Sequence, residues 1–366
     1  MIEAPELQQV DRTYVRYRGK KLSYFAGCDY FRLASHPKVL KAVKEGLKKY
    51  GLNVSASRTT TGNHKLYGEL EEALAKFFGV EDAILTTNGY LTNLAVAQGL
   101  AGEVQQVFID ERAHACLLDA AQLLGCPVTK FAHRSPGSLL TKWRDAGQPK
   151  HSLVMTDGMF AHDGSIAPLK DYLAVMPKDA LFLVDDAHAA GVLGKKGRGS
   201  VEHWKFPRKR VIQTATLSKA FGVYGGVILA PAKWHELILI KSRLLVGNTP
   251  MPLPLVNGCL AAVAERSKDA LIRKQLLKNI QWLRKELHRA GVAITEEESP
   301  IFAIVPKSVT EAEDMKKALL KAGIYPPFIQ YPGGPNSGYF RFAVSSEHTR
   351  EQLERLAEVL VANVGK

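Results

Sequence analysis

The stretch TATLSKAFGVYGG (residues 214–226), which lies downstream of VDDAHAAGVLGKKGRG (residues 184–199), decides the fold class of this chain. In residues 214–226, small residues surround Lys219, a short apolar run precedes it, and a glycine-rich turn follows it. A lysine in such a packed turn is withdrawn from water, which lowers its affinity for a proton. The amine is then a nucleophile suited to forming a Schiff base.

The upstream stretch begins with acids at the end of a strand-like run. Asp185 and Asp186 close the apolar residues 180–184, and His188 follows. An acid at the carboxyl end of a buried strand, a nearby histidine and a lysine beyond the next strand form the layout of a pyridoxal phosphate site. In such a site the acid faces the pyridinium nitrogen, and the lysine binds the aldehyde carbon. The small apolar residues after His188 argue against a solvent-facing acidic pair.

Short apolar segments alternate with helical patterns through the middle of the chain. This alternation predicts an α/β fold, with a mostly parallel sheet covered by helices on both faces. The expected strands are residues 82–86, 106–109, 128–131, 152–157, 181–185, 211–216 and 226–229. The expected helices include residues 66–78, 91–100 and 114–124.

The same patterns divide the chain into three parts. Within residues 1–35, apolar and polar residues alternate over short stretches, which predicts an N-terminal arm of short strands. Residues 36–250 are expected to form the large domain, which contains the cofactor motifs. After Pro254 a long helical stretch runs to about residue 290, and strands and helices follow it. Residues 251–366 are therefore expected to form a smaller α+β domain.

Composition and charge limit the class of protein. Of 366 residues, 46% are hydrophobic and 23% are charged, as in ordinary globular proteins. The formal net charge is +13, but the basic residues are spread along predicted helices without a nucleic-acid-binding motif, so we expect no nucleic acid partner. Most of these residues are expected on solvated helix faces, and the alternative interpretation is local attraction of an anionic substrate, such as the phosphates of coenzyme A.

The sequence also carries signals that bear on localisation. No apolar run reaches the roughly 18 residues that a membrane span needs, and the first residues lack the apolar core of a secretory signal. The four cysteines show no metal-binding spacing and are expected to be reduced thiols, with no metal site. We therefore expect a cytoplasmic enzyme.

A candidate phosphate cradle lies at residues 87–90, between a predicted strand and the predicted helix 91–100. Gly89 would let backbone N–H groups approach an anion, and the amino end of the helix adds a positive dipole. By itself the motif is weak, because an ordinary strand-to-helix turn has the same composition.

Together these motifs resemble one family. The runs TNGYLTNLAV, DERAHACLLDAA, DGMFAHDGSIAPL, DDAHAAGVLGKKGRG, TATLSKAFG and RFAVSSEHTREQL occur in the order typical of the α-oxoamine synthases. These are pyridoxal phosphate enzymes of fold type I that condense an amino acid with an acyl-coenzyme A thioester. The resemblance runs from about residue 25 to residue 361.

The resemblance implies a role for each matching residue. His114 would stack on the pyridine ring, Asp185 would keep its nitrogen protonated, and His188 would bind its 3-hydroxyl group. Lys219 would hold the cofactor as a Schiff base and then remove the Cα proton of the amino acid. The residues expected near the cofactor phosphate are Asn88, Gly89, Tyr90, Thr216 and, from a neighbouring subunit, Thr249.

Arg341 matches the family's arginine that binds the amino-acid carboxylate through a planar fork. The position of Thr249 implies a homodimer, although the residues just before Thr249 depart from the family pattern. The resemblance also leaves a role in biotin biosynthesis open.

Other departures surround the expected substrate pockets. Ala161 replaces a family serine, Tyr339 replaces a second arginine, and residues 331–337 replace a family loop. We expect the glycine-rich residues 332–338 to select the acyl group. These departures leave an aminotransferase, aldolase or decarboxylase as alternatives, and a cofactor-bearing regulatory or scaffold protein as a non-enzyme alternative.

Overall fold

The structure, a computed structural model, describes residues 5–268, 270–330 and 337–364. The chain folds into two compact units, each built from separate chain segments. The larger unit contains residues 33–160 and 166–269. The smaller unit contains residues 1–32, 161–165 and 270–366.

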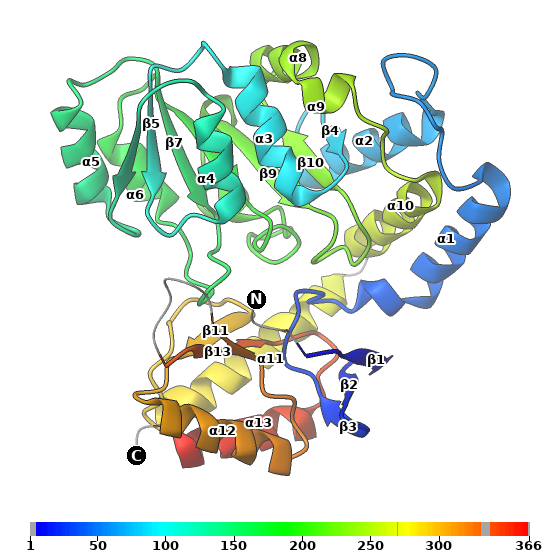
Figure 1. Cartoon of the computed structure of the whole chain (residues 1–366), viewed down its shortest axis with the longest axis vertical. Helices are drawn as coiled ribbons and strands as arrows, with labels where there is room; N and C mark the ends of the chain where they lie inside the picture. The colour runs from blue at the N-terminus through cyan, green and yellow to red at the C-terminus, as the bar shows by residue number, and fades with distance from the viewer. Residues whose placement is uncertain (1–4, 269, 331–336, 365–366) are drawn as a thin grey trace. The chain divides into compact units, whose positions relative to one another are not determined.

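A seven-stranded sheet forms the centre of the larger unit (Figure 1). In spatial order its strands are β4 (Ile84–Thr86), β10 (Gly226–Leu229), β9 (Val211–Thr216), β8 (Leu181–Asp185), β7 (Ser152–Asp157), β5 (Gln106–Asp110) and β6 (Val128–Phe131). The strands from β9 to β6 pair in parallel, whereas β10 is antiparallel to both of its neighbours. The prediction of a mostly parallel sheet is confirmed.

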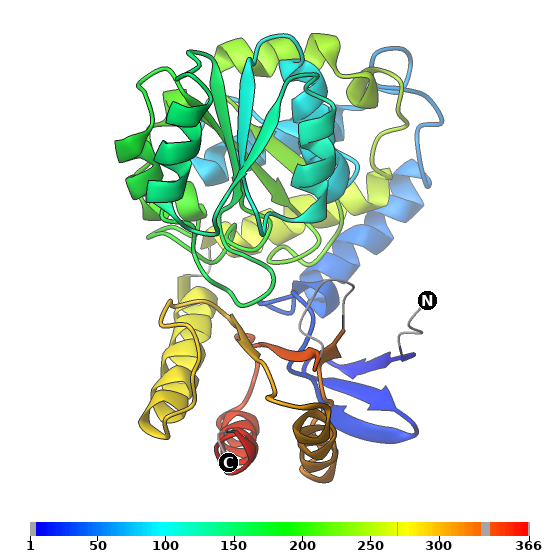
Figure 2. The same cartoon turned by 60° about the vertical axis from the view of Figure 1, so that its left-hand side comes forward.

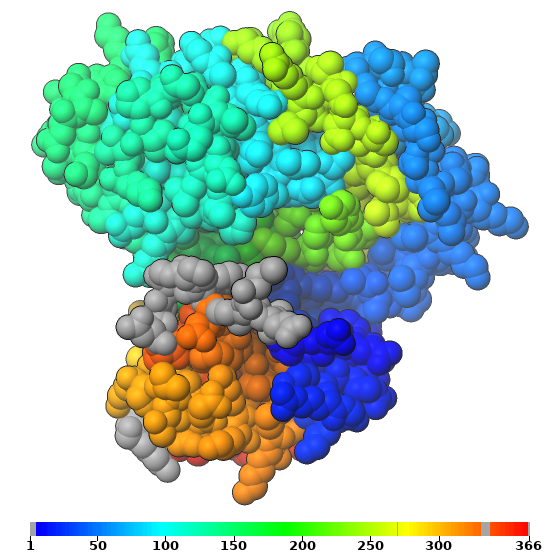
Figure 3. All heavy atoms as spheres, in the orientation of Figure 1, coloured from blue at the N-terminus to red at the C-terminus, as the bar shows by residue number. Residues whose placement is uncertain are grey.

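Helices cover both faces of this sheet (Figures 1 and 2). The helices of the larger unit are α1 (Pro37–Tyr50), α2 (Lys65–Phe78), α3 (Gly89–Leu100), α4 (Ala115–Gln122), α5 (Pro136–Asp145), α6 (Leu169–Val175), α7 (Ser200–His203), α8 (Ala232–Lys241), α9 (Arg243–Val246) and α10 (Leu253–Lys268). In the same orientation as Figure 1, atoms coloured cyan form part of the surface of the larger unit (Figure 3).

The two faces of the sheet have separate apolar cores because successive side chains of a strand point to opposite sides. Val107 and Ile109 of β5 pack with the core that includes α3 and α4. Phe108, between them, packs with the core that includes α5 and α6. Burial on both faces explains why the central strands have nearly continuous apolar sequences.

Helix α10 belongs to the larger unit, although the sequence pattern placed it in the small domain that was expected to begin at residue 251. It packs along α1 and α2. The close approach to α1 depends on two glycines: a Cβ on Gly46 would lie 3.0 Å from Pro254 Cα, and one on Gly258 would lie 2.5 Å from Val43 Cγ2. The last of the crossings between the units therefore falls between residues 269 and 270.

The smaller unit contains two antiparallel three-stranded sheets. The N-terminal arm forms β1 (Gln8–Asp11), β2 (Tyr14–Tyr17) and β3 (Lys20–Ser23). The second sheet has the order β11 (Ile301–Ile304), β13 (Tyr339–Ala343) and β12 (Phe328–Ile329), and the helices of this unit are α11 (Ala270–Arg289), α12 (Val309–Lys321) and α13 (Arg350–Asn363). A hydrogen bond of 2.8 Å from Ser23 N to Gly323 O joins the arm to the segment after α12.

A bilayer crossing needs a long apolar helix, and none of the helices within residues 5–268, 270–330 and 337–364 meets that requirement.

Gly99 tests the packing of α3 against α8. A Cβ at this position would lie 2.6 Å from Ile238 Cα, so the Gly99→Ala variant must separate the helices and should lose about 1–3 kcal/mol of unfolding free energy. The control is Gly68→Ala in α2, where a Cβ would meet nothing within 4 Å. The control should gain about 0.5–1 kcal/mol from helix propensity. Urea unfolding measures both, and equal effects would contradict the packing.

Candidate active site

The candidate site lies at the carboxyl edge of the parallel strands in the larger unit, where α/β proteins generally bind ligands. Asp157 ends β7, Asp185 ends β8 and Thr216 ends β9. Asp157 and Asp185 are paired in the sheet register. The parallel topology therefore brings together residues that are distant in the sequence.

Lys219 projects from a tight turn that follows β9. Its Nζ lies 2.8 Å from Nε2 of His188, and the side chain is partly buried. The turn is closed by a hydrogen bond of 2.9 Å from Gly222 N to Lys219 O. Gly222 has φ 67°, and a Cβ there would lie 2.3 Å from Ala34 N, so glycine is required. The structure thus brings the predicted lysine and histidine into direct contact.

Asp185 is 5% exposed, and both of its carboxylate oxygens accept hydrogen bonds. The N–H of Ala187 donates to Oδ1 at 2.9 Å, and Asn93 Nδ2 donates to Oδ2 at 2.6 Å. The thiol of Cys116 donates to Oδ2 over a longer 3.4 Å. Burial raises the pKa of Cys116, so this thiol keeps its proton.

The sequence interpretation missed Asn93. It lies in α3, whose residues are mostly apolar and buried, and its own side chain is fully buried. A buried asparagine needs hydrogen-bond partners, and Thr214 supplies one by donating to Asn93 Oδ1 at 2.8 Å. The signal in the sequence that could have identified Asn93 is an amide side chain among the apolar residues of this helix.

A second buried acid adjoins Asp185. Burial, with the neighbouring charge of Asp185, raises the pKa of Asp157 well above its usual value. Asp157 Oδ2 accepts a hydrogen bond of 2.8 Å from the backbone N–H of His114. Asp157 therefore keeps its proton more readily than an ordinary aspartic acid, and N–H donors point at both oxygens of the adjacent Asp185.

His114 precedes α4 and caps it, with Nδ1 accepting a hydrogen bond of 3.3 Å from Cys116 N. Burial lowers the pKa of His114, so the ring is neutral at pH 7. The ring of Tyr90 lies edge-on to it, with 6.2 Å between the ring centroids. A neutral, oriented imidazole is suited to stacking on an aromatic ring.

The segment predicted to cradle a phosphate lies at the amino end of α3. Asn88 caps the helix, with its side chain accepting a hydrogen bond of 3.0 Å from Leu91 N. A Cβ on Gly89 would lie 2.8 Å from Thr216 Cβ, so the two segments are in close contact. The first N–H groups of a helix lack intrahelical partners and can bind an anion.

The side chain of Tyr90 is bound elsewhere. Its hydroxyl donates a short hydrogen bond to the carboxylate of Asp119 in α4, and this bond raises the pKa of Tyr90 to about 12. The hydroxyl is therefore engaged by a carboxylate, which would repel a phosphate. Tyr90 can serve the cradle through its backbone N–H.

Thr249, the residue expected to act across subunits, is exposed in this chain. Its neighbour Asn248 donates to Thr87 Oγ1 at 3.3 Å, so this segment lies beside the cradle.

Arg341 lies on β13 of the smaller unit. Its Nε donates to the carbonyl of Ala161, and its Nη2 lies 3.5 Å from the sulfur of Cys28. Tyr339, on the same face of β13, packs against the ring of His162, with 4.2 Å between centroids. The departures at Ala161 and Tyr339 therefore both adjoin Arg341. Residues 331–336 of the loop expected to select the acyl group lie outside the described residues.

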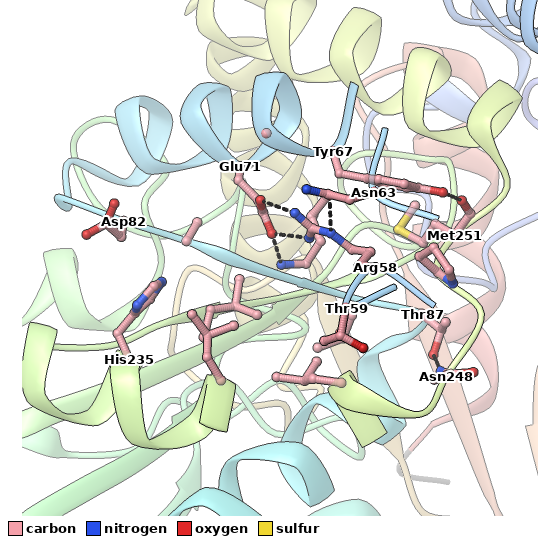
Figure 4. A pocket seen from close by; sticks show the side chains of 18 of the residues that line it. Arg58, Thr59, Asn63, Tyr67, Glu71, Asp82, Thr87, His235, Asn248 and Met251 are labelled. Carbon is pink, nitrogen blue, oxygen red and sulfur yellow. Dashed lines mark hydrogen bonds and ion pairs between the residues drawn. The ribbon is translucent and has the colours of Figure 1, made fainter. Parts of the chain in front are cut away.

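A separate pocket of about 500 Å³ lies between α2, β4 and the segment after α9 (Figure 4). Arg58 pairs with Glu71 through two hydrogen bonds of 2.6 and 2.9 Å. Glu71 also accepts a hydrogen bond of 3.0 Å from Leu85 N. These polar groups are paired with one another, and the sequence patterns did not indicate this pocket.

The donor set fits pyridoxal phosphate. An amine for the aldehyde, a buried carboxylate for the ring nitrogen, a neutral imidazole and a helix amino end with glycine occur on one edge of one sheet. Among the described residues, no group of three or more His, Cys, Asp or Glu is arranged to hold a metal ion.

Comparison with known proteins gives consistent matches along the chain. The family model described as aminotransferase class I and II matches residues 27–360. An 8-amino-7-oxononanoate synthase of Thioalkalivibrio sulfidiphilus is 34% identical over 345 residues, covering 93% of this chain and 88% of that protein. A putative 8-amino-7-oxononanoate synthase of Desulforudis audaxviator is 32% identical, covering 97% and 92%.

Solved structures agree with these matches. A serine palmitoyltransferase from S. paucimobilis, with bound pyridoxal phosphate and myriocin, superposes with a TM-score of 0.89 at 29% identity, covering 97% of this chain and 90% of that chain. An 8-amino-7-oxononanoate synthase from Francisella tularensis superposes with a TM-score of 0.80 at 26% identity, covering 94% and 98%.

The geometry at the amino end of α3 predicts that substitutions at two neighbouring positions affect cofactor binding to different extents. Tyr90→Phe should leave the dissociation constant for pyridoxal phosphate within about twofold, because the hydroxyl serves Asp119. Gly89→Ala should weaken binding about tenfold or more, because the new Cβ would lie only 2.8 Å from Thr216 Cβ and would push the two segments apart. Equilibrium dialysis measures both constants. A large loss in Tyr90→Phe would show that the hydroxyl reaches the phosphate.

Proposed function

Because this chain belongs to the aminotransferase class I and II family and, within it, to the α-oxoamine synthases, we infer that it is a pyridoxal phosphate-dependent acyltransferase. The reaction joins an amino acid to the acyl group of a coenzyme A thioester, with loss of carbon dioxide. The observation that carries this inference within the chain is Lys219 in contact with His188, on the same sheet edge as the buried Asp185.

We propose that each of these residues acts on one part of the cofactor or substrate. When bound, pyridoxal phosphate supplies an electron sink for the charge left on Cα of the amino acid. Asp185 keeps the ring nitrogen protonated, and His114 covers one face of the ring. Lys219 holds the aldehyde carbon and later takes the Cα proton, while His188, 2.8 Å from its amine, orients it.

Arg341 is proposed to bind the carboxylate of the amino acid. The Ala161 carbonyl fixes its Nε, which orients the two terminal nitrogens as a fork. Ala161 and Tyr339, where the sequence departs from the family, are thus placed to affect which amino acid is accepted. The net charge of +13 favours the anionic coenzyme A thioester as the second substrate.

We also propose a cytoplasmic homodimer in which Thr249 reaches the phosphate site of the second copy. The supporting observations are the exposure of Thr249 and the link from Asn248 to Thr87 at the cradle.

Product analysis tests the function. Purified protein with single amino acids and a series of acyl-coenzyme A thioesters should release coenzyme A and carbon dioxide in equal amounts, and Lys219→Ala should abolish both. Borohydride should fix the cofactor to Lys219, as located by mass spectrometry, and Lys178→Ala at an exposed lysine should leave that link intact. An oxo acid formed from the amino acid without any thioester would instead indicate aminotransfer.

Arg341→Ala should raise the amino-acid concentration for half-maximal rate about ten- to a hundredfold, the range for loss of a charged bidentate contact. Arg341→Lys should recover little, because an ammonium lacks the planar fork. The matched control is Arg355→Ala on α13, where Arg355 pairs with Glu351 at the surface. Unchanged half-saturation in Arg341→Ala would assign the carboxylate to another group.

A further inference from the structure

Hydrogen bonds at both the oxygen and the nitrogen of its amide fix the orientation of the Asn93 side chain. Thr214 Oγ1 donates to Asn93 Oδ1 at 2.8 Å, and Asn93 Nδ2 donates to Asp185 Oδ2 at 2.6 Å. The three side chains belong to α3, β9 and β8 and are 0%, 1% and 5% exposed, so water cannot substitute for either bond. Rotating the amide by half a turn would place its oxygen against the Asp185 carboxylate, which electrostatic repulsion disfavours.

These bonds also fix the plane of the carboxylate. Asn93 Nδ2 binds one oxygen of Asp185, and the N–H of Ala187 binds the other at 2.9 Å. Rotation of the carboxylate would break both bonds in a buried environment, where an unpaired charged oxygen is costly. The unused lone pairs therefore point in directions set by Asn93 and the backbone.

We propose that Asn93, anchored by Thr214, is a positioning residue that aims the Asp185 carboxylate at the ring nitrogen of pyridoxal phosphate. The proposal rests on the proposed function, because it takes Asp185 to be the partner of the ring. Asn93 acts through Asp185, whose orientation and charge it maintains by donating to Oδ2.

An alternative is that Asn93 only stabilises the fold by satisfying a buried acid. The two roles differ in their response to pH when the amide is replaced by an acid of the same shape. In Asn93→Asp, a protonated carboxyl can donate to Asp185 Oδ2 as the amide does. Once that proton is lost, two negative charges meet at the distance of a hydrogen bond and Asp185 is displaced.

Other titrating groups face Asp185 and are present in both proteins. They are Asp157 from β7, Asp186 next to Asp185 in the chain, His114 and Cys116 at the start of α4, His188 after β8 and Lys219 after β9. Their contribution cancels when the dissociation constant of the variant is divided by that of the unmodified protein at each pH. The ratio therefore reports the new carboxyl.

The experiment measures pyridoxal phosphate binding by equilibrium dialysis from pH 6 to pH 9. For Asn93→Asp the ratio of dissociation constants should lie near one at the acid end and rise about ten- to a hundredfold as pH increases. The matched control is Gln106→Glu, the same amide-to-acid change at the amino end of β5, where Gln106 Nε2 donates to Thr129 Oγ1 at 3.0 Å. Its ratio should not change with pH, even if unfolding shows a loss of stability.

Thr214→Val provides the second arm, because it removes only the hydroxyl that anchors Asn93. Thr214→Val should weaken cofactor binding about three- to tenfold. If Asn93→Asp shows no cooperative unfolding, and is therefore not folded, the result for Thr214→Val alone tests the proposal. A pH-independent ratio in a folded Asn93→Asp, or unmodified affinity in Thr214→Val, overturns the proposal. Failure of the proposed function is a different result, in which the unmodified protein binds no pyridoxal phosphate.

Discussion

The structure of the larger unit depends on keeping a charged carboxylate, that of Asp185, buried at the end of a central strand. An isolated buried charge would cost several kcal/mol or more, so donors must reach it from elsewhere in the fold. The turn after β8 supplies the N–H of Ala187, and α3 supplies the amide of Asn93. The positions of α3 and of this turn are thereby coupled to β8, and the same edge of the sheet presents Lys219 and the helix amino end.

Two other buried acids on this edge, Asp186 and Asp110, receive hydrogen bonds from different parts of the chain. Burial raises the pKa of Asp186 to about 7, although its carboxylate accepts hydrogen bonds of 2.5 Å from both Ser200 Oγ and Gln213 Nε2. These bonds tie the turn that carries His188 to the start of α7. Fully buried Asp110 accepts hydrogen bonds from the backbone N–H groups of Arg112 and Arg134. Each acid thus fixes a connection on the edge of the sheet that holds the candidate site, and polar networks of this kind rigidify a site.

The sequence allowed prediction of features that depend on local pattern. The alternation of strands and helices indicated the sheet, and the motifs around Lys219 and His188 indicated one common site, in which the two side chains lie 2.8 Å apart. It could not reveal contacts made between distant segments. Asn93 and Asp185 are 92 residues apart, and the bond from Tyr90 to Asp119 depends on how α3 packs on α4. The assignment of α10 was similarly decided by its packing on α1, which helical periodicity does not encode.

One consequence follows from the segment 161–165, which belongs to the smaller unit although its flanking residues on both sides belong to the larger one. The chain therefore passes between the units four times, at residues 32/33, 160/161, 165/166 and 269/270. Cleavage at the last of these crossings would separate residues 270–366 from the arm and from Ala161, which holds Arg341. Neither unit can be obtained as one uninterrupted peptide. Reconstitution of either unit from fragments would require non-contiguous pieces of the chain to assemble.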